Sequence, residues 1–260
     1  MLAWLKSLPK QRAFWSDTPC VGCGFKLRRT FPTIWDGLSN EWGLTTELRR
    51  QMDLRESTLC ARCRTNARAQ GIGRALLNDL AKRHAIKAET VRALAAMDLP
   101  RDLRIAEINA LPGLHKHFAK MPNAVCSEYG GDNHEDLMAL SYPDETFDYV
   151  LTSDSLEHVP DFDVALNEIR RVLKPEGQHI FTIPVIWDRK TRIRASVVEG
   201  KRVDHLPPSH HGNPKTAAGD WIVFNEFGGD VVKRIESAGF SVEVCRTGNP
   251  LDATIVAERL

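Results

Sequence analysis

Four of the six cysteines stand in two closely spaced pairs, Cys20 with Cys23 and Cys60 with Cys63. A Cys-x2-Cys turn supplies two thiolates from one tight bend, and two such turns complete the tetrahedral sulfur set that Zn²⁺ prefers. No histidine or acidic residue is placed to act as a further ligand, which indicates a closed, structural site. The pattern therefore predicts a four-cysteine zinc module, with four reduced thiols or a redox or iron–sulfur role as alternatives.

Two acidic residues, Glu107 and Glu128, lie in or at the end of short apolar runs that read as strands, residues 103–108 and 124–128. Ligands of doubly wound sheets bind at the carboxyl ends of the strands. Glu128 lies 21 residues after Glu107, and an acid at this spacing can accept hydrogen bonds from both hydroxyls of a ribose. A solvated carboxylate at a strand end is the alternative for Glu128. The loop between the runs has one glycine, Gly113, where nucleotide folds usually have several, and it is weak evidence by itself.

The remaining sequence alternates between strand and helix patterns. The expected order implies an α/β fold with a doubly wound, mostly parallel sheet. Lys174–Gly177 is expected to form a turn, because a proline and a glycine follow a helix there. Ahead of residue 100, helical patterns are expected near 46–53 and over 66–96. The other strands are expected at 147–152, 179–185, 240–244 and 253–257, and the helices near 114–119, at 163–173 and at 229–237.

The length of 260 residues allows one large domain and one small module. We expect a zinc module with a connecting helix over 1–100 and a larger domain over 101–260, with an insertion at about 187–220. Residues 1–100 carry 17 Lys and Arg against 9 Asp and Glu, whereas the rest carries 18 against 25. The basic front part could face phosphates, an acidic partner or solvent. No apolar run is long enough to span a membrane, and the expected location is the cytoplasm.

Four segments carry a family resemblance when they are taken in order: Glu135–Val150, Ser153–Val159, Arg170–Gly177 and Ala238–Phe240. They resemble the acidic turn with its Phe-Asp strand, the Leu-Glu-His segment, the Arg-Val-Leu-Lys-Pro-Gly-Gly run and the Ala-Gly-Phe break of class I S-adenosylmethionine (SAM)-dependent methyltransferases of the type-11 kind. The resemblance covers roughly residues 103–257. It implies SAM as cofactor and a Rossmann-like, seven-stranded sheet. The front part, with its Arg55-Glu56 pair and Arg68, resembles a subset of bacterial relatives that carry four cysteines ahead of this domain.

The resemblance also implies roles for individual residues. Asp136 would meet the adenine amino group, with Leu137 or Met138 beside the ring, and Glu128 would hold the ribose. Asn109 and Ala110, with Glu107 beneath them, would face the methionine end, and Ser153 and Asp154 would lie by the sulfonium. The sequence departs from the family in the first loop, where Asn109–Gly113 replaces Gly-x-Gly-x-Gly. The candidate cofactor-binding residues are Glu107, Asn109, Ala110, Glu128, Asp136, Leu137 and Ser153.

Methylation of a hydroxyl benefits from a base that removes its proton. His158, at the edge of the implied cleft, and the His210-His211 pair in the insertion are candidates, together with Asp154. The insertion is expected to form a lid or an acceptor site, with a metal site or plain surface histidines as alternatives for the pair. The predicted function is O-methylation of a small molecule or a glycan. RNA methylation and a non-catalytic, methyltransferase-like role are the alternatives.

Overall fold

The computed structural model describes residues 11–210, 221–249 and 251–260, which divide into two compact units. The first unit comprises Met1–Met97, Leu111–His117 and Arg246–Ala253, and the second comprises Asp98–Ala110, Phe118–Cys245 and Thr254–Leu260. Two excursions of the later chain, one after the first strand of the large sheet and one before its last strand, thus belong to the first unit. His211, a candidate base, lies outside the described residues.

The first unit contains a small antiparallel sheet of order β1-β2-β3, formed by Arg12–Trp15, Leu27–Thr30 and Leu59–Cys60. The side chains of Thr45 and Asn66 cap the next two long helices by accepting hydrogen bonds from backbone N–H groups two or three residues into each helix. The range 66–96 forms two helices rather than one, because α3 ends at Arg83 and α4 begins only after the capping residue Thr90. The helices of this part are α1 (Asp36–Glu41), α2 (Thr46–Ser57), α3 (Ala67–Arg83) and α4 (Val91–Leu94), with α5 (His115–Phe118) later in the chain.

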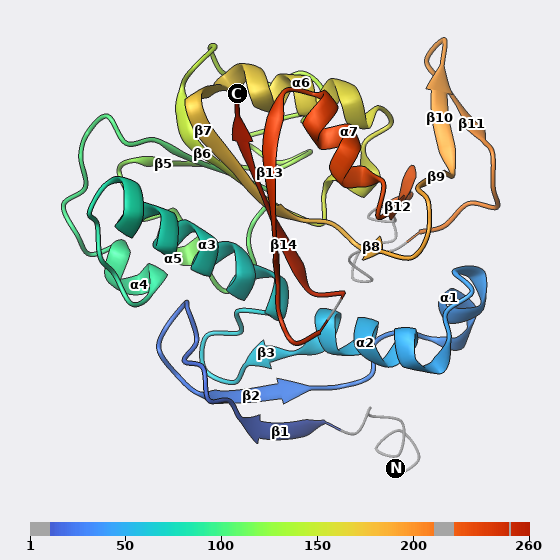
Figure 1. Ribbon diagram of the computed structural model, residues 1–260, viewed down its shortest axis with the longest axis horizontal. Coiled ribbons are helices and arrows are strands. Elements are labelled where there is room, and N and C mark those ends of the chain that lie inside the picture. Colours follow the sequence, from blue (N-terminus) through green and yellow to red (C-terminus); the bar gives the residue numbers. More distant parts are fainter. Residues whose placement is uncertain (1–10, 211–220, 250) are drawn as a thin grey trace. The chain divides into compact units, whose positions relative to one another are not determined.

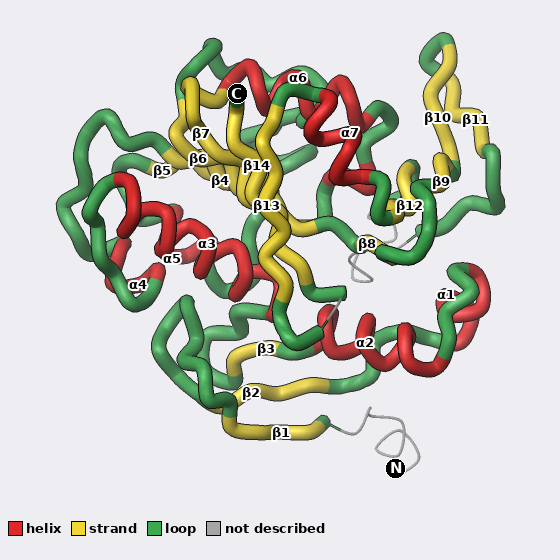
Figure 2. Tube along the Cα trace, in the orientation of Figure 1, coloured by secondary structure: helices red, strands yellow, loops and turns green. Residues whose placement is uncertain are grey.

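The second unit is built on a six-stranded sheet of order β13-β14-β7-β6-β4-β5 (Figures 1 and 2). Its strands β5, β4, β6 and β7 pair in parallel, and β14 pairs antiparallel to β7. The mostly parallel α/β sheet expected from the sequence is therefore confirmed. The strands are β4 (Ile105–Ile108), β5 (Ala124–Ser127), β6 (Phe147–Ser153), β7 (Leu173–Thr182), β13 (Phe240–Arg246) and β14 (Ala253–Arg259).

Helices α6 (Phe162–Val172) and α7 (Val231–Ser237) cover one apolar side of this sheet, since their buried residues share one core cluster with side chains of the strands. Asp161 begins α6 by accepting hydrogen bonds from the backbone of Asp163 and Val164. The core residues Phe162, Leu166 and Ile169 recur at helical spacing along its buried face. This packing fixes the carboxyl ends of the parallel strands, from which the candidate site residues extend.

The structure describes six strands in the large sheet, so the seventh expected strand is not confirmed. Between β5 and β6 the described chain forms only isolated bridges, Glu128 with His134 and Asp136 with Ala139. The intervening Gly130–Asn133 is rich in residues that disfavour strands. This segment bends instead of adding a strand to the sheet.

The expected turn at Lys174–Gly177 is wrong, because these residues lie within β7. Phe147 of β6 aligns with Leu173 and Tyr149 with Gln178, so that β7 advances five residues where β6 advances two. The extra residues form a bulge in which Glu176 has a φ of 62°. The same Pro-Gly signal thus marks an irregular strand.

The insertion also contains regular structure where no periodicity was recognised. A hairpin forms from β10 (Ala195–Val198) and β11 (Lys201–Asp204), and β9 of the insertion joins β8 and β12, which flank the insertion, in a second small sheet of order β8-β12-β9. Its strands are β8 (Val185–Ile186), β9 (Arg192–Ile193) and β12 (Asn225–Gly228). Each strand is only two to four residues long, which is too short for a period of two to be read from the sequence. No helix in the described part of the chain is both long and apolar enough to cross a membrane.

Candidate cofactor and metal sites

The four paired cysteines converge on one point in the first unit. All four are buried, and their Sγ atoms lie within 4.8 Å of one another. The Sγ atoms of Cys20 and Cys63 are 3.4 Å apart, and those of Cys23 and Cys60 are 3.7 Å apart. Four sulfurs at about 2.3 Å from a tetrahedral zinc ion would be about 3.8 Å from each other. The donor set and its dimensions therefore fit zinc.

Both cysteine pairs are held in similar turns. In the first, the N–H groups of Cys23 and Gly24 donate to the carbonyl oxygen of Cys20 at 3.2 and 2.7 Å. In the second, the N–H of Arg64 donates to the carbonyl oxygen of Cys60 at 3.0 Å. Gly24 and Arg64 both have positive φ, 78° and 66°. The two turns thus present their sulfurs in the same way, although only one has a glycine at the strained position.

Two further side chains hydrogen-bond to these sulfurs. The Nε2 of Gln70 donates to Cys20 Sγ at 3.1 Å, and Thr65 Oγ1 lies 3.0 Å from Cys63 Sγ. The hydrogen bond with Cys63, and to a smaller extent that from Gln70, lowers the pKa of Cys20 to about 4, against the opposing effect of burial. A lower pKa favours the thiolate, which is the form that binds a metal. Sequence reasoning missed both residues, since neither belongs to a Cys-x2-Cys pattern.

In the second unit, Asn109 joins the ends of three parallel strands. Its Nδ2 donates to Ser155 Oγ at 3.0 Å, and its Oδ1 accepts from the N–H of Tyr129 at 3.1 Å. Asn109 has a φ of 63°, a left-handed conformation that asparagine adopts more readily than most residues. It thus provides, without a glycine, the turn that follows β4. Glu107 is fully buried within β4, and Ala110 is exposed.

Glu128 follows β5 directly, its side chain is exposed, and two glycines, Gly130 and Gly131, lie close after it in the chain. A Cβ added at Gly130 would meet nothing within 4 Å, whereas one at Gly131 would lie 2.4 Å from the Glu128 side chain. The two glycines therefore leave room for the carboxylate and for a ligand beside it. Tyr129, which sequence reasoning missed, is 51% exposed here and its ring contacts that of Trp221 at 5.7 Å.

Asp136 lies in a short turn together with the two apolar candidates for the adenine ring. Its Oδ1 accepts from the N–H of Met138 at 2.9 Å, and its carbonyl oxygen accepts from the N–H of Ala139 at the same distance. Leu137 is buried and Met138 is half-buried against the core. This turn presents a partly exposed carboxylate beside apolar side chains, which suits an adenine with its amino group.

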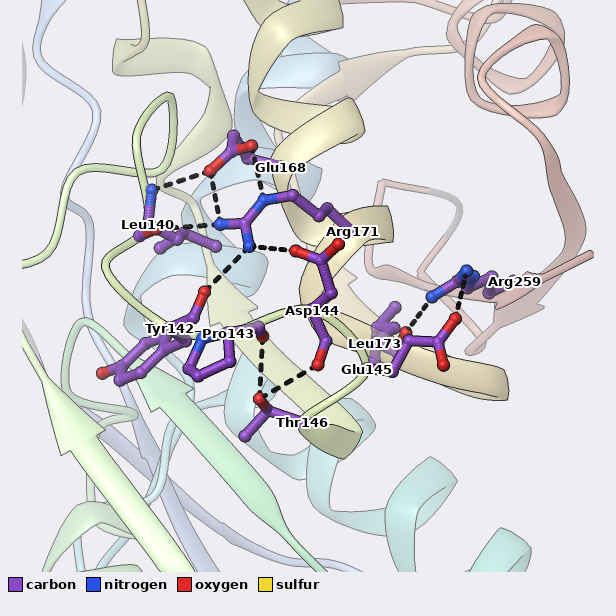
Figure 3. Close-up of polar contacts among 10 residues, drawn as sticks. All are labelled: Leu140, Tyr142, Pro143, Asp144, Glu145, Thr146, Glu168, Arg171, Leu173 and Arg259. Carbon is purple, nitrogen blue, oxygen red and sulfur yellow. Dashed lines mark hydrogen bonds and ion pairs between the residues drawn. The ribbon is translucent and has the colours of Figure 1, made fainter.

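A clamp centred on Arg171 holds the segment that follows this turn (Figure 3). Its guanidinium donates to the carbonyl oxygens of Leu140 and Tyr142 at 2.9 and 2.8 Å, and to the carboxylates of Glu168 and Asp144. Glu168 in turn accepts from the N–H of Leu140 at 3.0 Å. The arginine of the Arg-Val-Leu-Lys-Pro run therefore fixes the chain between Asp136 and β6.

Ser153 and Asp154, at the end of β6, share a hydrogen-bond chain with Thr182 at the end of β7. Thr182 Oγ1 lies 3.1 Å from Ser153 Oγ and donates to Asp154 Oδ1 at 2.9 Å. The N–H of Asp154 donates to the carbonyl oxygen of Thr182 at 2.9 Å, and Asp154 has a φ of 47°. Thr182 was not among the predicted site residues, because nothing in its own strand distinguishes it.

His158 ends the one-turn helix η2 (Leu156–His158) and is largely buried. Its Nδ1 lies 2.9 Å from the carbonyl oxygen of Ile222, so Nδ1 carries the proton of the neutral ring and Nε2 does not. Burial lowers the pKa of His158, while the Ile222 carbonyl and the charge of Asp154 oppose that effect. His158 is therefore neutral at pH 7 with Nε2 as the proton acceptor.

The structure brings part of the insertion to His158. Ile222 also forms an isolated bridge with His210, so two of the candidate bases share one backbone neighbour. Of the four arginines in the insertion, Arg194 and Arg192 bind the buried carboxylate of Glu226, Arg189 lies 4.0 Å from it, and Arg202 pairs with Asp204. These arginines are therefore engaged in ion pairs within the protein.

Comparison with known proteins finds that part of the chain is similar to a known family of domains. Residues 115–181 match the family model described as "Methyltransferase domain". Demethylmenaquinone methyltransferases of Staphylococcus aureus and Bacillus subtilis are 52% and 49% identical over 44 and 45 residues, 17% of this chain and 18% and 19% of their own length. The chain thus spans less than a fifth of the curated relatives it matches.

Two solved structures are similar to the chain at low identity. A SAM-dependent methyltransferase from Mesorhizobium loti is 18% identical, with a TM-score of 0.40 over 70% of this chain and all of that one. DesVI of Streptomyces venezuelae is 12% identical, with a TM-score of 0.44 over 72% of this chain and 98% of that one. The fold described above rests on the strand order itself. The matched family region includes the Asp136 turn, the Leu-Glu-His segment and the Arg171 clamp.

Proposed function

We propose that the chain is a SAM-dependent methyltransferase that methylates a hydroxyl group of a glycan or another small molecule. The observation that carries the proposal is that Asn109 links the carboxyl ends of the parallel strands β4, β5 and β6 by hydrogen bonds. Glu128, the Asp136 turn and Ser153 extend from the neighbouring parts of the same sheet. The match of residues 115–181 to a methyltransferase domain supports this assignment.

The residues suit SAM in charge and polarity. The exposed carboxylate of Glu128 and the room at Gly130 suit a ribose, and Asp136 with Leu137 suits an adenine. Bound SAM supplies an electrophilic methyl group on a sulfonium. The four-cysteine cluster would hold zinc as a structural ion, with all four positions occupied by protein sulfur.

His158 is the proposed general base. Its Nδ1–H donates to the Ile222 carbonyl, which fixes the ring and leaves the lone pair of Nε2, 3.8 Å from Glu157 Oε1, to accept a proton. Nε2 would accept the proton of the acceptor O–H, while the acceptor oxygen would displace sulfur from the methyl carbon, so that the carbon–sulfur bond breaks and S-adenosylhomocysteine leaves. Asp154 stabilises the imidazolium so formed, since its charge already raises the pKa of His158.

Two exposed aromatic residues near His158 support the proposed acceptor class. Trp221 precedes Ile222 in the chain and is 40% exposed, and its ring meets that of the exposed Tyr129 edge to face. Exposed aromatic faces bind the C–H face of a sugar or another ring. This supports a ring-shaped hydroxyl acceptor. RNA and a non-catalytic role are the outcomes that the test must separate from it.

The test begins with S-adenosylhomocysteine (SAH) binding by calorimetry, followed by a methyl-transfer screen of glycans, small hydroxylated molecules and RNA. The key variant is His158→Asn, whose amide can still donate to the Ile222 carbonyl but cannot act as the base. We expect a loss of about 10²- to 10⁴-fold in kcat with SAH affinity unchanged. The wild-type rate should fall only below the lowered pKa of His158. The control is His84→Asn at the exposed C-cap of α3, which should keep the wild-type rate, and an unchanged rate in His158→Asn would rule out His158 as the base.

A further inference from the structure

The loop that follows β4 is built into the four-cysteine unit. Its residues Leu111–His117 belong to the first unit, although Asn109 and Ala110, which precede them, belong to the second. In the proposed function this loop takes the place of the family's glycine-rich cofactor loop. Its conformation therefore matters for the binding of SAM.

Gly113 packs directly on the second cysteine turn. A Cβ added to Gly113 would lie 2.4 Å from the backbone nitrogen of Thr65 and 2.6 Å from its Oγ1. The same Oγ1 lies 3.0 Å from Cys63 Sγ, and the carbonyl oxygen of Thr65 accepts from the N–H of Cys60 at 2.9 Å. Thr65 therefore contacts both the loop, at Gly113, and two of the four cysteines, Cys60 and Cys63.

Leu114 packs on the first cysteine turn in the same way. It is fully buried, and a Cβ added at Gly22 would lie 3.1 Å from its Cδ2 and 3.3 Å from Cys63 Sγ. On its other side, a Cβ added at Gly73 of α3 would lie 3.1 Å from Leu114 Cδ1. Any side chain at Gly22 or Gly73 would push Leu114 away. Small residues on both sides thus fix the loop against the cluster.

We infer that the four-cysteine cluster positions the loop after β4 through Thr65 and Gly113, so that cofactor affinity depends on the bound metal. The inference rests on the proposed function. Asn109 anchors one end of the loop to Ser155 and Tyr129 at the strand edge. Gly113, four residues later, anchors the other end to the cysteine turn. Gly113 and Thr65 are positioning residues in this account, since they act through the loop.

The decisive variant is Gly113→Ala, with Gly200→Ala as its matched control. Both glycines have similar φ values, 77° and 74°, but an added Cβ at Gly200 would meet nothing within 4 Å. The control therefore carries the backbone strain without the collision with Thr65. We expect Gly113→Ala to keep one zinc per chain and to weaken SAH binding at least tenfold, while Gly200→Ala stays within twofold of the wild type.

The second measurement removes zinc from the wild-type chain with a chelator. We expect SAH affinity to fall at least tenfold and amide exchange of residues 109–118 to become faster. Full SAH affinity in the metal-free chain, or in Gly113→Ala, would overturn the inference. If the zinc-loaded wild type itself fails to bind SAH, the proposed function fails. Amide exchange over 109–118 then decides the link between metal and loop on its own, and unchanged exchange would refute it.

Discussion

In the six-stranded unit, side chains of α6, α7, five strands of the large sheet and the short strands β8 and β12 form one continuous apolar cluster. Around the cysteine turns, by contrast, the cluster consists of the four cysteines with Phe25 packed against them. Buried apolar side chains such as Val21 and Leu114 pack nearby, and ion pairs add to them, as where Glu56 binds both Arg55 and Arg68. The large unit can therefore be held by burial of apolar surface, whereas the region of the cysteine turns depends on sulfur chemistry.

Replacement of Cys60 tests most directly whether the first unit depends on zinc for its fold. Cys60→Ser removes one of four thiolates, and a structural zinc site contributes on the order of 10 kcal/mol to folding. We expect elemental analysis to show less than one zinc per chain and hydrogen exchange to show unfolding of residues 11–97. The six-stranded unit should keep its exchange protection. Cys245→Ser on β13 is the control and should keep zinc and fold, and a metal-free but fully protected Cys60→Ser would contradict the account.

Arg171 tests whether the six-stranded unit also depends on polar contacts at one place. Arg171→Gln leaves the carbonyl oxygens of Leu140 and Tyr142 and the Glu168 carboxylate without their shared donor (Figure 3). Loss of charged hydrogen bonds at this partly buried position should cost about 2 to 4 kcal/mol in the free energy of unfolding. Chemical denaturation measures it. Arg50→Gln in the exposed helical pair with Glu47 is the control and should change little, and equal effects of the two variants would refute the clamp.

The smallest expected effect is the dependence of the large unit's stability on pH, which we attribute to His179. His179 is fully buried on β7, its Nε2 lies 3.0 Å from Thr152 Oγ1, and burial lowers its pKa to about 3. The unfolded chain binds a proton near pH 6.5 and the folded unit does not, so stability falls as pH drops below 6.5. From pH 6.5 to 5 this group should cost about 2 kcal/mol.

His179→Leu should remove that part of the pH dependence, whatever its effect at pH 7. Amide exchange of β7 at pH 7 and pH 5, corrected for intrinsic rates, measures the difference. His205→Leu, at an exposed position, should keep the wild-type slope. The same slope in His179→Leu as in the wild type would show that the buried ring does not set it.

Strong periodic patterns predicted the elements of the large unit well. The apolar positions of α6 and the short runs at β4, β5 and β6 lie within a residue or two of their expected bounds, because one-sided burial leaves a helical period in α6 and burial of the strands leaves continuous apolar runs. The convergence of the four cysteines also followed from their spacing. The zinc ion itself and the roles of the site residues stay predictions.

Other features depend on contacts between residues far apart in the chain. The left-handed conformation of Asn109 replaces a glycine, and no local pattern shows that Ser155 and Tyr129 will hold its side chain. Thr65 lies 48 positions from Gly113, yet its backbone is the surface on which the loop packs. The bulge at Glu176 likewise depends on the register with β6, so the Pro-Gly signal was read as a turn.

We propose that SAM binds at the carboxyl ends of the parallel strands in the six-stranded sheet. Calorimetry with SAH on two Asp136 variants tests this proposal most directly. Asp136→Ala removes the proposed adenine acceptor and also the hydrogen bond from the N–H of Met138. Asp136→Asn can keep that turn bond while it places an amide donor opposite the adenine amino group. The account predicts that SAH binds the wild type and at least tenfold more weakly both variants. Wild-type affinity in Asp136→Asn, or no SAH binding by the zinc-loaded wild type, would contradict it.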